Sequence, residues 1–116
     1  MAITGVHSLF YSAEAEKLRS VLTEAFGFES VDDGQDKGWL IFRLPPAEMG
    51  VHPADGPSHE VSFMCDDITT TMADLQAKGV EFEGDPIDEG WGIAAKMFLP
   101  GQVEVLLYQP RHTTAI

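Results

Sequence analysis

The fold of this chain is decided by a nine-residue stretch, DGQDKGWLI at residues 33–41, which recurs 52 positions later as DPIDEGWGI at residues 85–93. The only two tryptophans of the chain, Trp39 and Trp91, occupy the same place in the two copies, and each follows a glycine. At the same offset, and with no gap between residues 7 and 104, further identical pairs align: His7 with His59, Ala25 with Ala77, Gly27 with Gly79, Glu29 with Glu81 and Val51 with Val103. We infer an internal duplication.

Each copy predicts the same order of elements. An apolar extended segment opens each half, at residues 6–11 and 61–65. Apolar residues then recur at helical spacing, from a candidate N-cap at Ser12 to Gly27 and from Asp67 to Gly79. Three short strands are expected after each helix, because turn residues divide the sequence there into three short apolar runs. Their ranges are 28–32, 39–44 and 48–53 in the first half, and 80–83, 91–99 and 103–109 in the second.

Two βαβββ modules in tandem follow from this order, at about 3–54 and 57–110, within one domain of residues 1–116. A sheet with a helix on one face leaves its other face uncovered, so the two modules are expected to pair. The predicted fold class is α+β, with curved sheets that enclose a cleft. Such a cleft is the expected place for a functional site.

Composition excludes several classes of function. The formal net charge is −12, which disfavours nucleic acid and anionic membranes as partners. This acidity indicates either solubility or the attraction of a cationic ligand. The single cysteine, Cys65, cannot form an internal disulfide, and the first twenty residues lack the apolar run of a signal peptide. We expect a cytoplasmic protein.

The repeat also aligns possible metal ligands. The 52-residue offset aligns His52 with Glu104. The first half therefore supplies the pair His7 and His52, and the second half supplies the pair His59 and Glu104. In each pair, one residue lies on the opening strand and one on the closing strand. Imidazole and carboxylate groups together suit divalent iron, zinc, nickel or manganese. The alternative to a metal site is that the histidines are simply exposed. Glu104 would then be a polar residue on the water-facing side of its strand.

Other residues are weaker candidates. Trp39 and Trp91 fill core positions or line the cleft, and Cys65 is a small buried filler. Contact with a substrate is conceivable for four more side chains, but no spacing supports any of them: Tyr11, Arg43, Lys96 and Tyr108.

Three stretches resemble the vicinal oxygen chelate superfamily of glyoxalases, bleomycin resistance proteins and extradiol dioxygenases. They are Gly5-Val6-His7, the segment HEVSFMCDD at residues 59–67, and LPGQVE at residues 99–104. The resemblance covers nearly the whole chain. It implies metal ligands on the first and last strands of each module, where the four candidates lie. When the closing motif of the family is counted from Pro100 without a gap, the last metal ligand falls on Leu106. The 52-residue offset instead places this ligand at Glu104.

The resemblance implies a metal-dependent enzyme whose small substrate chelates the metal through two neighbouring oxygens. With Fe(II), which we favour, His7, His59 and Glu104 would hold the metal and His52 would act as acid or base in a dioxygenase-like reaction. With all four ligands on nickel or zinc, a glyoxalase or isomerase activity is the alternative. A third hypothesis is a metal-free protein that sequesters an antibiotic. Because members of the family commonly pair, we expect a homodimer.

Overall fold

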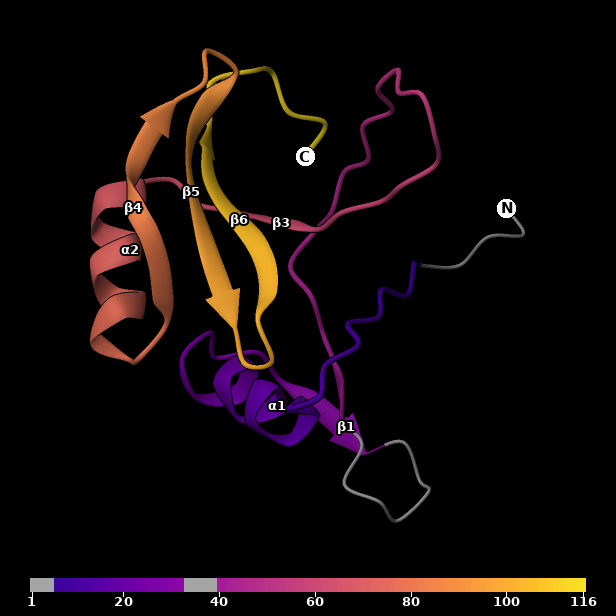
Figure 1. The fold of residues 1–116 in the computed structure, drawn as a ribbon, viewed down its shortest axis with the longest axis vertical. Coiled ribbons are helices and arrows are strands. Elements are labelled where there is room, and N and C mark those ends of the chain that lie inside the picture. Colours follow the sequence, from indigo (N-terminus) through magenta and orange to yellow (C-terminus); the bar gives the residue numbers. More distant parts are fainter. Residues whose placement is uncertain (1–5, 33–39) are drawn as a thin grey trace.

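A computed structural model describes residues 6–32 and 40–116 of the chain (Figure 1). Within these residues the helices are α1 (Ala15–Glu24) and α2 (Ile68–Ala77). The strands are β1 (Ser30–Asp32), β2 (Leu40–Phe42), β3 (Ser62–Met64), β4 (Glu81–Asp88), β5 (Gly92–Leu99) and β6 (Val103–Pro110).

The second half forms the βαβββ unit that its sequence predicts. Its four strands make one sheet in the order β3-β6-β5-β4, in which β3 runs parallel to β6 and the other neighbours are antiparallel. The strands and α2 begin and end within a few residues of the predicted ranges, except that β4 continues to Asp88. β4 is also irregular, because its register with β5 shifts between Glu83 and Ile87.

Both helices pack on the same face of this sheet. Leu18 and Leu22 of α1 and Met72 and Leu75 of α2 belong to one core cluster with alternate residues of β5 and β6. Met97 of β5 lies at the centre of this cluster and is fully buried. The hydrophobic core therefore lies between the helices and one face of the sheet, and we call the opposite face the open face.

Local signals explain where the helices begin and end. Asp67 caps α2 as predicted, because its side chain accepts a hydrogen bond from the backbone N–H of Thr70 at 3.2 Å. Gly79 follows α2 with a φ of +92°, which favours glycine. The prediction of Ser12 as the N-cap of α1 was wrong: the residue before α1 is Glu14, and it makes no side-chain cap.

The first half departs from the predicted module. Its helix and the strands β1 and β2 are present, but residues 6–11 and 48–53 are not in strands. A strand exists only where its backbone pairs with a neighbour. β1 and β2 pair with each other, as a separate two-stranded sheet, and neither outer segment pairs with them. Trp39 lies outside the described residues. It is the first residue of the strand predicted at 39–44, and the rest of that range is described.

Candidate functional site on the open face

Strand alternation decides which side chains reach the open face. Met97 is buried under the helices, so its neighbours along β5, Lys96 and Phe98, point the other way. The register then sets Lys96 beside Leu106 of β6 and Glu83 of β4. The remaining positions on this face, from the same register, are Ser62, Met64, Glu81, Ile87, Gly92, Ala94, Phe98, Glu104, Tyr108 and Pro110.

A lysine between two carboxylates occupies the middle of the open face. The Lys96 Nζ atom lies 3.4 Å from a Glu83 carboxylate oxygen and 3.6 Å from a Glu104 carboxylate oxygen. The hydrogen bond with Glu83, and then the negative charge of Glu104, raise the pKa of Lys96. All three side chains are partly exposed and screened by solvent, so the two ion pairs contribute little to stability. A ligand could displace them at small cost.

An aromatic group borders these charges. Trp91, one residue before β5, packs edge-on against Tyr108 with ring centroids 5.3 Å apart. The His112 ring lies 5.9 Å from the Tyr108 ring, between centroids. Gly92 lies beside them, and a Cβ there would come within 2.8 Å of the backbone oxygen of Gln109. Burial raises the pKa of the Tyr108 hydroxyl, and the charge of Glu48 adds to this effect.

Trp91 is 45% exposed, so it is not a core residue. Its exposure fits the alternative that it lines a binding surface. Aromatic side chains that remain accessible beside polar groups are typical of sites that hold a planar ligand.

Glu104 lies on the open face, but it is not buried. Its side chain is 58% exposed and pairs with Lys96, which fits the alternative that Glu104 is the polar residue of a strand with one face in water. Strand alternation also places Leu106 on the same face as Glu104, two residues further along β6. Both positions suggested for the last metal ligand therefore point toward the same space.

The predicted metal ligands are not assembled within one chain. His7, His52 and His59 are all exposed, and each lies outside the strands. In residues 6–32 and 40–116, no three histidine, cysteine, aspartate or glutamate side chains are grouped so that they could hold a metal ion. The Lys96 ammonium also opposes a divalent cation at Glu104 by charge repulsion. Within the described residues, the candidate ligands are therefore not placed together around one metal ion.

Cys65 follows β3 and is half-buried, as expected for a small filler. Its Sγ atom lies 3.6 Å from the backbone oxygen of Tyr108. Desolvation raises the pKa of the thiol, and the charges of Asp66 and Asp67 add to this effect. The thiol is therefore poorly suited to nucleophilic chemistry.

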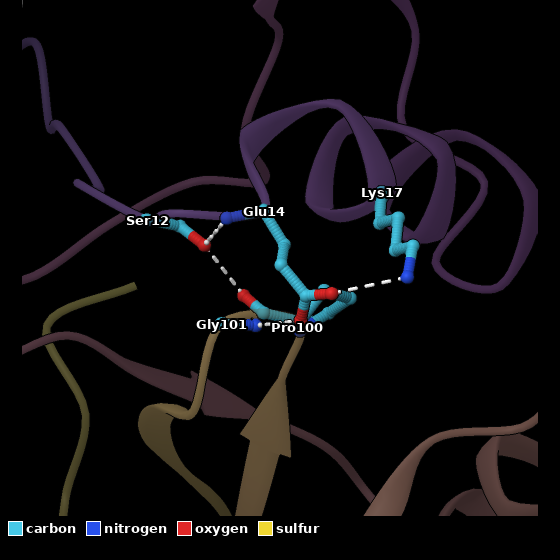
Figure 2. Close-up of polar contacts among 5 residues, drawn as sticks. All are labelled: Ser12, Glu14, Lys17, Pro100 and Gly101. Carbon is cyan, nitrogen blue, oxygen red and sulfur yellow. Dashed lines mark hydrogen bonds and ion pairs between the residues drawn. The ribbon is translucent and has the colours of Figure 1, made fainter.

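A polar clamp joins the two halves (Figure 2). The Ser12 hydroxyl donates to the backbone oxygen of Pro100 at 2.7 Å, and the Glu14 carboxylate accepts the N–H of Gly101 at 2.9 Å. Glu14 also pairs with Lys17 at 3.0 Å.

An open cavity of about 230 Å³ lies beside this clamp, with Val80 and Phe98 in its lining. No described residue gives this cavity a buried polar group, and we assign it no function.

Sequence reasoning named Lys96 only as a possible substrate contact without a supporting spacing, and it did not consider Glu83 or His112. A signal for Lys96 was available, because it is the one charge in the apolar run of residues 91–99. Its partner Glu83 could not be found in this way, since the pairing depends on the register of β4 with β5.

In the part of the chain described, neither helix is long and apolar enough to cross a membrane.

Comparisons with known proteins support the predicted family fold. No family model matches the chain. The uncharacterised protein YetH of Bacillus subtilis (strain 168) is 28% identical, over 71% of this chain and 78% of that protein.

Solved structures are similar over nearly the full length. TnmS3, an antibiotic binding protein from Streptomyces sp. CB03234, is 26% identical with a TM-score of 0.69, over 95% of this chain and 98% of that one. A glyoxalase/bleomycin resistance protein/dioxygenase superfamily member from Sphaerobacter thermophilus DSM 20745 is 23% identical, with a TM-score of 0.66. The match covers 94% of this chain and 99% of that one. Lactoylglutathione lyase from Agrobacterium tumefaciens is 12% identical, with a TM-score of 0.64. The match covers 94% of this chain and 96% of that one. The chain thus has the fold of the glyoxalase/bleomycin resistance protein/dioxygenase superfamily, which its sequence resembles.

Proposed function

We propose that this protein binds a planar, cationic organic molecule on the open face, without a metal ion. The observation that carries the proposal is the pair of the exposed Trp91 with the partly buried Tyr108 at one end of an acidic sheet face. An aromatic ring can stack on such a pair, and a positive charge on the ring strengthens the contact through the ring quadrupole.

The charges of the open face favour a cation. Three carboxylates, those of Glu81, Glu83 and Glu104, share this face with the single ammonium of Lys96. The net charge of −12 adds a long-range attraction for positive ligands. The likeness to TnmS3, an antibiotic binding protein, further supports binding without chemical conversion.

Lys96 is the internal competitor of such a ligand. Its ammonium now neutralises Glu83 and Glu104, so a cationic ligand has to take its place. Removing the lysine should therefore improve binding of a cation, while removing Glu104 should weaken it. A ligand with a negative charge would respond in the opposite way to both changes.

The test is calorimetric titration with proflavine, a planar aromatic cation, and with anthracene-9-carboxylate, a planar anion. We expect proflavine to bind, Lys96→Gln to tighten it several-fold, Glu104→Gln to weaken it several-fold, and Trp91→Ala to weaken it about tenfold. Glu24→Gln is the matched control, because Glu24 belongs to α1 on the opposite face. Preference for the anion, or equal affinity in all variants, would overturn the proposal.

A metal-dependent enzyme is the second candidate. It is supported by the positions of Glu104 on the open face and of His59 three residues before β3, whose residues lie next to β6. Under this hypothesis His7 and His52 complete the ligand set, with Fe(II) ahead of zinc, nickel or manganese, and His52 and Glu104 take part in the reaction. Substrates would be dioxygenase-like or glyoxalase-like, as the family resemblance implies.

Elemental analysis separates the two candidates. Protein purified without a metal-binding tag, and the variants His59→Ala and Glu104→Ala, would be measured after anaerobic addition of Fe(II) or Zn(II). Near-stoichiometric metal that is lost in both variants would favour the enzyme. Proflavine binding with no metal uptake would favour the binding protein.

A further inference from the structure

The chain beyond β6 folds back toward the aromatic group of the open face. Residues 111–116 turn back beside the strand instead of continuing its line (Figure 1). The backbone N–H of Arg111 donates to the backbone oxygen of Trp91 at 2.9 Å, and its guanidinium pairs with the carboxylate of Asp88. Arg111 is therefore anchored to the connection that carries Trp91. We call the residues after this anchor, 112–116, the strap.

His112 of the strap lies against the hydroxyl of Tyr108. Its Nε2 atom is 3.3 Å from the Tyr108 hydroxyl oxygen, and its Nδ1 atom is 2.9 Å from the backbone oxygen of Thr113. A backbone oxygen can only accept, so Nδ1 carries the hydrogen, and Nε2 of the neutral ring accepts from the Tyr108 hydroxyl. The two rings are tilted by 35°, with centroids 5.9 Å apart. An aromatic heterocycle thus already occupies the space beside Tyr108 that the proposed ligand needs.

A second attachment joins the strap to the first half of the chain. The backbone N–H of Ala115 donates to a carboxylate oxygen of Glu48 at 3.3 Å. This carboxylate lies near the same aromatic ring, because burial, and then the charge of Glu48, raise the pKa of the Tyr108 hydroxyl. While the strap is in place, it therefore engages both the ring and a negative charge close to it.

The contacts that hold the strap are weak. None of its residues is buried, and only Thr114 is partly shielded. The hydrogen bonds of His112 and Ala115 are exposed, so each replaces a bond with water and contributes little. A segment without buried apolar contacts opens at small cost in free energy. A ligand can therefore displace the strap from Tyr108 while the hydrophobic core and the Arg111 anchor stay in place.

We propose that the strap is an internal competitor for the binding surface of the open face. In the free protein, His112 takes the place of the ligand beside Tyr108, and the strap turns away about Arg111 when a planar cation binds. Its release also frees the Glu48 carboxylate to face the positive charge. Because only molecules with an open strap can bind, the closed strap lowers the apparent affinity. This inference rests on the proposed function, since it concerns the regulation of the same site.

Calorimetric titration of the variant His112→Ala with proflavine is the first test. The variant loses the ring and the hydrogen bond that close the strap, so it should bind proflavine about threefold to tenfold more tightly than the wild type. Thr113→Ala is the matched control, because Thr113 is exposed and is the next residue of the strap. It should bind like the wild type. Unchanged affinity in His112→Ala would overturn the proposal, and so would weaker binding, which would make His112 a ligand contact.

Nuclear magnetic resonance of the unaltered protein supplies a second test that depends on no variant. The heteronuclear NOE of a backbone amide reports motion on the picosecond-to-nanosecond timescale. Without ligand, the amides of residues 112–116 should be about as ordered as those of β6, and saturating proflavine should make them mobile. A strap that is mobile without ligand, or that stays ordered when proflavine is bound, would contradict the proposal.

The same titrations separate this inference from the proposed function. Absence of proflavine binding by both the wild type and His112→Ala would contradict the proposed function, and the role of the strap would fall with it. Proflavine binding that leaves the amides of the strap unchanged would contradict the role of the strap alone. Tighter binding by His112→Ala, together with loss of order in the wild-type strap, supports both.

Discussion

The carboxylate of Glu14, just before α1, accepts the backbone N–H of Gly101 in the turn between β5 and β6, at 2.9 Å. These residues are 87 positions apart in the chain, so the contact fixes the first half on the second. The neighbouring bond from Ser12 to Pro100 acts in the same place (Figure 2). The clamp holds α1 against the sheet at the end where β5 and β6 turn.

The clamp should make stability depend on pH. The hydrogen bond from Lys17, and then that from Gly101, lower the pKa of Glu14. A lowered pKa means that the ionised carboxylate stabilises the fold above the usual value of 4.5, and that this contribution is lost as the pH falls through the folded-state pKa. Glu14→Gln should melt below the wild type at about pH 7 and match it at about pH 3. Melting curves across this range, with Glu24→Gln as control, check the result.

Gly101 should not tolerate a side chain. Its φ is +85°, and a Cβ would fall on the Ser12 hydroxyl oxygen. We expect Gly101→Ala to lower the free energy of unfolding by about 1–3 kcal/mol, through backbone strain and displacement of Ser12. Gly56→Ala is the control, because no atom lies within 4 Å of the added Cβ. Urea denaturation measures both, and equal stability of the two variants would contradict the account of the clamp.

Met97 should be the most costly core position of β5. Its side chain is 0% exposed and belongs to the core cluster that residues of both helices and of β5 and β6 form. Met97→Ala removes buried apolar area and leaves a cavity, so we expect a loss of about 2–5 kcal/mol in the free energy of unfolding. Gln76→Ala, at an exposed position of α2, should change it by less than about 0.5 kcal/mol. A small effect of Met97→Ala would mean that the strands do not enclose this side chain.

Cys65 should react slowly while the protein is folded. Burial raises the pKa of its thiol, which lowers the fraction of reactive thiolate at neutral pH. Ellman's reagent at about pH 8 should label the folded protein at least several-fold more slowly than the urea-unfolded chain. Equal rates in the two states would show that the thiol is not shielded by Tyr108 and β3.

The sequence predicts the second half of the fold well, because that half is complete in itself. The cap at Asp67, the helix stop at Gly79 and the apolar runs of β5 and β6 act through neighbouring residues, and the structure confirms them. The prediction failed for residues 6–11 and 48–53 because a strand needs a pairing partner, and these segments pair with no strand among the described residues. Ser12 was misjudged for a related reason, since its hydroxyl donates to Pro100 far away in the sequence.

The candidate site was predicted in part. The repeat directed attention to Glu104, which the structure places on the open face, and to Trp91, which it leaves exposed. The repeat could not reveal that Lys96 pairs with Glu104, because the contact depends on the register between two strands of the second half alone. The proposal for His7, His52 and His59 as metal ligands still awaits the metal analysis.

The irregular outer strand β4 limits what the sheet can become. Pro86 lacks a backbone N–H, and the shift between Glu83 and Ile87 interrupts the regular row of donors and acceptors. A sheet that accepts a new strand on one side only is saturated by a single addition. Contacts made through the edges of this four-stranded sheet are therefore self-limiting, because growth edge to edge into a filament needs both of its outer strands.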